Sequence, residues 1–286
     1  RHGVRLMRLA NVAGRLVSQE GADLVDVATA SDGRFGPDPH SALDRWDEFT
    51  AWSFSRPAAG AMLPAPVDAG PPVPRPSQVF GIGLNYADHA GESGMALPSQ
   101  PMVFPKFSSC ITGPGAVALP SDTVDWEVEL VVVIGRTARH VDSADAWAHV
   151  AGLTVGQDLS DRALQFAGGA SSQFGLGKSL PGFGPIGPWL VTPDELTDPS
   201  NLEISCQLNG ARMQHSHTKH LIFTVPALIA FLSSHLPLHP GDLIFTGTPA
   251  GVGHGRDPAV YLRPGDELVS TIEGLGSLTT RIGSAS

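Results

Sequence analysis

The stretch DWEVELVVVIG, residues 125–135, decides the fold of this chain. Its branched apolar residues predict a β-strand, and because side chains alternate along a strand, Glu127 and Glu129 share one face. The four apolar residues 131–134 indicate that the strand is buried on both faces. Two buried carboxylates repel each other and lose their hydration, and a cation relieves both penalties. The alternative is a pair that faces solvent on a half-exposed strand, the usual outcome for an isolated ExE pattern.

Similar apolar runs, separated by Gly, Pro and Asp, occur along most of the chain and predict an α+β fold that is mostly β. Helical segments are expected at residues 41–56, 143–149 and 224–233. Seven prolines in residues 57–78 cannot continue a helix or a central strand, so this segment is an extended connector. We therefore expect a small N-terminal α/β domain with the proline-rich linker in residues 1–70 and a catalytic domain in residues 71–286.

Composition excludes several functional classes. Eighteen basic and 28 acidic side chains give a net charge of −10, which disfavours binding to nucleic acid. The longest uncharged run, residues 220–241, has an apolar centre of twelve residues, whereas a membrane span needs about twenty. The two cysteines, Cys110 and Cys206, have no ligand spacing and are expected to be buried and reduced, as in a cytoplasmic protein.

A third carboxylate completes a candidate metal site. Asp158 ends the apolar run in LTVGQDLSDR, residues 153–162. Together with the two glutamates it offers only oxygen ligands, which suit Mg²⁺, Mn²⁺ or Ca²⁺ and do not suit zinc. The rival candidate is QHSHTKH, residues 214–220, where a strand would place His215 and His217 on one side and His220 opposite. No carboxylate or cysteine nearby in the sequence completes a tetrahedral zinc site there.

Two further segments carry polar residues suited to catalysis. In GIGLNYADHAGES, residues 81–93, His89 and Glu92 are three apart and would face each other on a helical turn, which suits a general base for water; a surface pair is the alternative. Lys178 is a lone lysine in an apolar loop, and Thr248 ends a strand in the small-residue loop of IFTGTPAGVG. Surface and turn positions, respectively, are the alternatives for these two residues. GxSxG, Walker and HExxH motifs are absent from the sequence.

The order of these segments resembles the fumarylacetoacetate hydrolase family, in particular its bacterial acylpyruvase and 2-hydroxyhepta-2,4-diene-1,7-dioate isomerase-like branch. The match spans about residues 73–283 and rests on seven motifs in family order: NYADHAGE, PMVFPKFSSCITGPG, WEVELVVVIG, GQDLSDRALQ, GKSLPGFGPIGPW, IFTGTPAGVG and LRPGDELVSTIEGLG. The resemblance implies a mixed β-roll or sandwich catalytic domain with a small N-terminal domain, commonly assembled as a homodimer.

The resemblance also implies the roles of the site residues. The metal, Mg²⁺ or Mn²⁺, with Ca²⁺ as a further ion that the isolated protein could carry, would be held by Glu127, Glu129 and Asp158. His89 and Glu92 would activate water. Around the carboxylate and keto oxygens of the substrate, the resemblance places Lys178, Gln165, Thr248 and Lys106.

The implied function is metal-dependent hydrolysis of a carbon–carbon bond in acylpyruvate-like diketo acids through an enolate, in aromatic or related carbon catabolism. The alternatives are a 2-oxo diacid decarboxylase of the oxaloacetate type, an isomerase or a hydratase at the same site, and a non-catalytic binder of small carboxylates. Phe107 and residues 180–182 depart from the common family pattern where the substrate tail is expected, which leaves the acyl group open.

Overall fold

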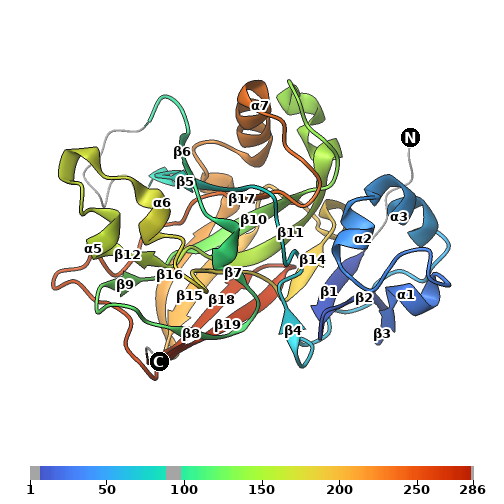
Figure 1. Ribbon diagram of the computed structural model, residues 1–286, viewed down its shortest axis with the longest axis horizontal. Helices are drawn as coiled ribbons and strands as arrows, with labels where there is room; N and C mark the ends of the chain where they lie inside the picture. Colours follow the sequence, from blue (N-terminus) through green and yellow to red (C-terminus); the bar gives the residue numbers. More distant parts are fainter. Residues whose placement is uncertain (1–6, 88–97, 285–286) are drawn as a thin grey trace.

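The computed structural model describes residues 7–87 and 98–284 (Figure 1). His89 and Glu92 therefore lie outside the described residues. Within these ranges two large mixed β-sheets dominate, so the expectation of a mostly β fold with both strand orientations is confirmed. Two short pairs of strands, β12 with β9 and β13 with β7, lie outside these sheets.

The larger sheet has ten strands in the order β3-β2-β1-β14-β11-β10-β17-β5-β6, with β4 also paired to β1. Its strands are β1 (Arg8–Val12), β2 (Arg15–Glu20), β3 (Asp23–Asp26), β4 (Ala69–Gly70), β5 (Val79–Gly83), β6 (Met102–Pro105), β10 (Val128–Ile134), β11 (Val150–Gln157), β14 (Trp189–Val191) and β17 (Leu243–Phe245). At its centre β10 pairs antiparallel with β11 and β17, and β17 pairs in parallel with β5.

The smaller sheet has five strands in the order β16-β15-β18-β19-β8. They are β8 (Gly115–Ala118), β15 (Glu203–Leu208), β16 (Ala211–His217), β18 (Glu267–Ile272) and β19 (Gly276–Gly283). The short strands outside both sheets are β7 (Ile111–Thr112), β9 (Val124–Asp125), β12 (Ser160–Asp161) and β13 (Gly184–Pro185).

Strand β10 shows why the sequence folds in this way. Val128, Leu130 and Val132 point into the core shared with the smaller sheet, whereas Val131 and Val133 belong to a second core on the opposite face. All seven residues of the strand are buried, as the continuous apolar run predicts. Because the side-chain period is two, residues 127 and 129 lie on the same face as Val131 and Val133.

Helices cover the edges and ends of the sheets (Figure 1). The α-helices are α1 (Val27–Ala30), α2 (His40–Leu43), α3 (Trp46–Ser53), α5 (Arg162–Gln165), α6 (Phe174–Gly177) and α7 (Val225–His235). Short 3-10 helices occur at Ser108–Cys110, Ser143–His149, Gly169–Ser171, Pro193–Glu195 and Thr218–His220. The single helix expected at residues 41–56 is interrupted, because Arg45, with φ −129° and ψ 39°, is not helical and caps a new helix that begins at Trp46.

The N-terminal strands are continuous with the catalytic part of the chain. Leu9 pairs with Leu190 across β1 and β14, so the sheet runs on from the strands of residues 7–26 to those of residues 150–191. In Figure 1 these strands and α1–α3 lie at one end, and α5 and α6 lie at the other. The division at residue 70 remains a prediction, and a shared sheet crosses it.

Among the described residues, no helix is long and apolar enough to cross a membrane. Cys110 and Cys206 are buried and unpaired, as expected. Burial raises the pKa of both thiols, that of Cys206 to about 12.

Candidate active site

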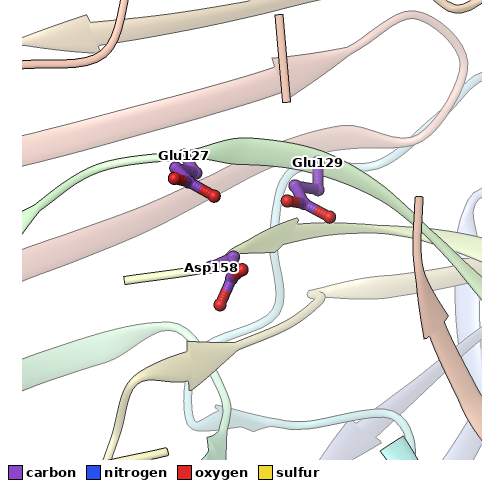
Figure 2. Close-up of side chains that lie close together, drawn as sticks. All are labelled: Glu127, Glu129 and Asp158. Atoms are coloured by element: carbon purple, nitrogen blue, oxygen red, sulfur yellow. The ribbon is translucent and has the colours of Figure 1, made fainter. Parts of the chain in front are cut away.

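Three carboxylates converge at the point where β10 begins and β11 ends (Figure 2). Glu129 lies on β10, and Glu127 is the residue just before this strand. Asp158 directly follows β11, whose last residue Gln157 pairs with Val128 of β10. The Asp158 N–H donates to the Glu127 carbonyl at 2.9 Å, which holds the two strands in register. One ligand oxygen from each carboxylate lies within 4.8 Å of the others, and all three residues are buried. The sequence prediction that these carboxylates meet at one point is confirmed.

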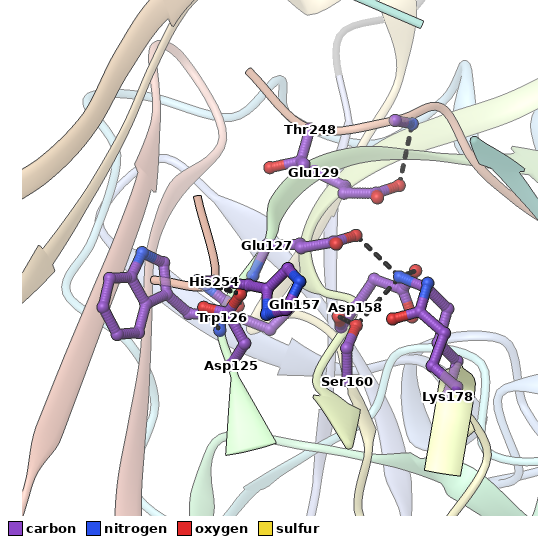
Figure 3. A network of polar contacts seen from close by, with 12 residues as sticks. Asp125, Trp126, Glu127, Glu129, Gln157, Asp158, Ser160, Lys178, Thr248 and His254 are labelled. Carbon is purple, nitrogen blue, oxygen red and sulfur yellow. Dashed lines mark hydrogen bonds and ion pairs between the residues drawn. The ribbon is translucent and has the colours of Figure 1, made fainter. Parts of the chain in front are cut away.

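Buried cations contact this cluster, and one of them, Lys178, is labelled in Figure 3. Lys178, at the end of α6, donates to Glu127 Oε2 at 2.7 Å, Asp158 Oδ2 at 2.6 Å and Ser160 Oγ at 2.8 Å. Burial alone would lower the pKa of Lys178, but the carboxylates of Asp158 and Glu127 outweigh it and raise this pKa above its usual value. The side chain therefore stays an ammonium.

Lys106 lies behind the cluster and contacts Asp158. Its Nζ donates to Asp158 Oδ1 at 2.6 Å, to the Phe183 carbonyl at 3.3 Å and to the Lys178 carbonyl. Its side chain has no exposed surface and is not among the described residues that line the adjacent cavity. Lys106 therefore contacts Asp158 without lining the cavity, and its expected role beside the substrate stays a prediction.

Arg162 completes the charge balance and was not predicted from the sequence. Its Nη2 lies 2.8 Å from Glu127 Oε1 and 2.7 Å from Asp125 Oδ2, and its Nη1 donates to Gln165 Oε1 at 2.9 Å. Burial opposes the charge on this guanidinium, but Glu127 and Asp125 raise its pKa. The sequence feature that could have indicated Arg162 is its position in the motif GQDLSDRALQ, four residues after Asp158.

Four carboxylates and three cations meet here, so one negative charge is left uncompensated. Its effect falls on Glu129, whose pKa is raised well above its usual value by burial and then by Asp158 and Glu127. The Gly247 N–H donates to Glu129 Oε2 at 2.8 Å and opposes this shift. A hard divalent cation fits this all-oxygen, electron-rich donor set and would remove the penalty.

A cavity of about 250 Å³ opens beside the carboxylates. The polar side chains that line it include Glu127, Arg162, Gln165, Lys178 and Thr248, so the expected substrate-binding Gln165 and Thr248 do face it. Phe107 and residues 180–182, expected near the substrate tail, are not among its described lining residues. The lining beyond the polar end is apolar: Ile82, Leu84, Met102, Phe104, Phe166, Phe174 and Val252, with His254 among them.

The rival histidine cluster does not form a metal site in the described part of the chain. His215 Nε2 is 2.9 Å from Glu203 Oε1 on an exposed surface, and its ring centroid is 6.2 Å from that of His217. Among the residues described, the acidic cluster is the one group of three or more ligand side chains with ligand atoms within 4.8 Å of one another. The catalytic roles of His89 and Glu92 stay predictions.

Comparison with known proteins decides the family. Residues 78–283 match the model of the fumarylacetoacetate hydrolase C-terminal domain. This chain belongs to the fumarylacetoacetate hydrolase family. It is 45% identical to the mitochondrial oxaloacetate tautomerase Fahd2a of Rattus norvegicus over 82% of this chain and 76% of the relative. The chain is accordingly an enzyme of this family.

Two solved structures support the assignment. A fumarylacetoacetate hydrolase from psychrophilic Exiguobacterium antarcticum shares 30% identity and a TM-score of 0.81, over 99% of this chain and all of that one. A fumarylpyruvate hydrolase from Pseudomonas aeruginosa in complex with Mn²⁺ and pyruvate shares 30% identity and a TM-score of 0.67, over 73% of this chain and 91% of that one. The second relative contains a metal, and the acidic cluster of this chain suits one.

Proposed function

We propose that this enzyme hydrolyses a carbon–carbon bond in acylpyruvate-like 2,4-dioxo acids and depends on Mg²⁺ or Mn²⁺ held by Glu127, Glu129 and Asp158. The observation that carries the proposal is the buried acidic cluster at the polar end of a largely apolar cavity. A hydrolase in complex with Mn²⁺ and pyruvate among the structural relatives supports it. Such a substrate has a carboxylate and a keto group for the polar end and an acyl group for the remaining space.

The bound divalent cation would supply a positive charge that polarises the 2-oxo acid and favours its enolate. Lys178 and Arg162 stay protonated and face the same end of the cavity, so they stabilise the negative charge that develops on the substrate. Thr248 Oγ1 donates to the Val128 carbonyl at 2.9 Å and accepts from Gln214 Nε2 at 2.7 Å, so this hydroxyl is fixed in the wall of the cavity. The charges of Lys178 and Arg162 are held in place before the substrate arrives, and a preorganised electrostatic group contributes about 3–4 kcal/mol to transition-state stabilisation.

Hydrolysis also needs an activated water. We assign this step to His89, oriented by Glu92: the imidazole takes a proton from water, and the hydroxide adds to the distal carbonyl carbon. The bond between that carbon and the methylene carbon then breaks. Its electron pair forms the enolate of pyruvate, which takes a proton to give pyruvate, and the acyl group leaves as a carboxylic acid.

A second candidate is keto–enol tautomerisation of oxaloacetate. The sequence relatives favour it, because the 45% identical rat protein and a 47% identical Bos taurus protein are both oxaloacetate tautomerases. This reaction uses the same polar end of the cavity but consumes no water. The two candidates therefore differ in what they require of His89.

The test measures pyruvate release from a panel of acylpyruvates and, separately, the loss of enol absorbance from oxaloacetate. The proposal predicts pyruvate release that stops in excess chelator and in Glu127→Ala, and that is lost in His89→Ala. Glu203→Ala serves as a control, because this glutamate is exposed and pairs with His215 at the surface. Oxaloacetate turnover without acylpyruvate cleavage would establish the second candidate instead. Full acylpyruvate turnover in excess chelator would exclude the proposed mechanism.

A further inference from the structure

Aromatic side chains form a continuous series from the charged end of the cavity to its mouth. The Lys178 Nζ lies 5.3 Å from the ring centroid of Phe104, which marks the boundary between the two ends. Phe104 then contacts Phe174 edge to face, with centroids 5.8 Å apart, and Phe174 contacts Phe166 at the same distance. Phe166 in turn stacks on His254, with centroids 5.5 Å and planes 28° apart. A flat group in the cavity would meet ring faces and edges along this series.

The cations that face the cavity are engaged at its inner end. The three hydrogen-bond donors of Lys178 are directed to Glu127, Asp158 and Ser160. Arg162 is directed to Asp125, Glu127 and Gln165, although the sequence places it near the mouth residue Phe166. No other arginine or lysine is among the described residues that line the cavity, and residues 88–97 contain neither in the sequence.

His254 is the remaining polar side chain toward the mouth. Its Nδ1 lies 2.9 Å from the Tyr261 hydroxyl, and one ring face is covered by Phe166. The imidazole is therefore presented as part of the aromatic wall. A carboxylate against these rings would lose part of its hydration without gaining an arginine or lysine partner from the described lining.

We infer that the substrate's acyl group is planar and uncharged, and that Phe104, Phe166 and Phe174 select it. This inference rests on the proposed function, because it names the acyl group of the same 2,4-dioxo acids. It separates this chain's substrate from dicarboxylic members of that class, whose distal carboxylate would lie against the phenylalanines.

The experiment compares two matched substrates with the Mg²⁺-loaded enzyme. Both are 2,4-dioxo-4-phenylbutanoates, one with a para carboxamide and one with a para carboxylate, so that they differ in charge and hardly in shape. We expect kcat/KM to be higher for the carboxamide by about tenfold to a hundredfold, a range set by the partly exposed mouth. Phe166 is 41% exposed, so its substitution is compatible with folding.

The variant Phe166→Arg places a cation at the mouth and should move the ratio toward the carboxylate by at least about tenfold. The matched variant Phe166→Leu keeps an apolar side chain and should retain the preference for the carboxamide. Equal turnover of both substrates by the wild type, or a preference for the carboxylate, would overturn the inference and leave the hydrolase proposal standing. A carboxylate preference that disappears in His254→Gln would identify His254 as the group that binds it.

A binding measurement separates failure of the inference from failure of the proposed function. Calorimetric titration of the Mg²⁺-loaded enzyme would compare 5-methyl-2-oxohexanoate with 2-oxoglutarate, which has a carboxylate where the former has an isopropyl group. If no dioxo acid is cleaved, the proposed function fails. The inference that the acyl group is uncharged then stands or falls on this pair: tighter binding of the branched acid supports it, and equal or tighter binding of 2-oxoglutarate overturns it.

Discussion

Replacing Lys178 by Met removes the ammonium that bridges two carboxylates of the cluster. The side chain is buried and donates three hydrogen bonds of 2.6–2.8 Å. Its loss raises the excess of buried negative charge from one to two. Breaking a buried ion pair in this way costs about 3–5 kcal/mol, so we expect Lys178→Met to lower the free energy of unfolding by that amount in excess chelator.

Divalent metal should reverse part of this loss. The cation supplies the charge that Lys178→Met lacks, and it no longer meets the repulsion of the ammonium. Saturating Mg²⁺ should therefore stabilise the variant more than the wild type, by at least about 1.4 kcal/mol, which corresponds to a tenfold difference in affinity. The variant should still lose catalysis, by about 10²–10³ in kcat, because a fixed positive charge beside the developing negative charge is missing.

Urea unfolding followed by tryptophan fluorescence, in chelator and in Mg²⁺, measures both effects. Lys219→Met is the matched control, because this lysine is exposed on the 3-10 helix Thr218–His220 and should change stability little in either condition. The reasoning is refuted if Lys178→Met costs under about 1 kcal/mol in chelator, or if Mg²⁺ stabilises wild type and variant equally.

Three further outcomes are expected. Gly247 has a φ of +101°, and a Cβ added there would lie 2.7 Å from Asn85 Cβ. Gly247→Ala should therefore displace the N–H that donates to Glu129, and calorimetry should show Mn²⁺ binding weakened about 10- to 100-fold. Asp125→Ala removes one of the two buried carboxylates that pair with Arg162, together with the acceptor of the Gly253 and His254 N–H groups, and should lower the free energy of unfolding by about 3 kcal/mol or more in urea titrations. Burial raises the pKa of Cys206 to about 12, so as the pH rises the thiol ionises in the unfolded state before it does in the folded state. The wild type should therefore lose stability as the pH rises from about 8.5 toward 12, and Cys206→Ala should lose less. Iodoacetamide should not label Cys206 of the native protein at pH 9.

The sequence was most informative where a local pattern determines the structure. The alternation of Glu127, Glu129 and the following valines fixes one face of a strand, and the buried run predicts that both faces are covered. Asp158 could be placed beside the glutamates because it ends a second apolar run that resembles a neighbouring strand. The family resemblance added Gln165 and Thr248, and the structure brings both to the cavity.

Features that depend on long-range packing could not be predicted. The pairing of Leu9 with Leu190, which joins the N-terminal strands to the catalytic sheet, leaves no local trace in either segment. The contacts that Lys106 makes with the Phe183 and Lys178 carbonyls, far along the chain, likewise could not be predicted, and its expected role beside the substrate stays a prediction. Arg162 could not be predicted, because an arginine in a short helix is usually exposed. Its burial depends on the ion pair with Asp125, which lies in a different segment of the sequence.

Titration of the metal-free enzyme with Mn²⁺, followed by calorimetry and by the electron paramagnetic resonance of the free ion, tests the central claim most directly. The account predicts one tight site per chain that disappears in Glu129→Gln and is retained in Glu203→Gln, whose glutamate lies at the surface. Binding of Mn²⁺ with unchanged stoichiometry and affinity in Glu129→Gln would contradict it.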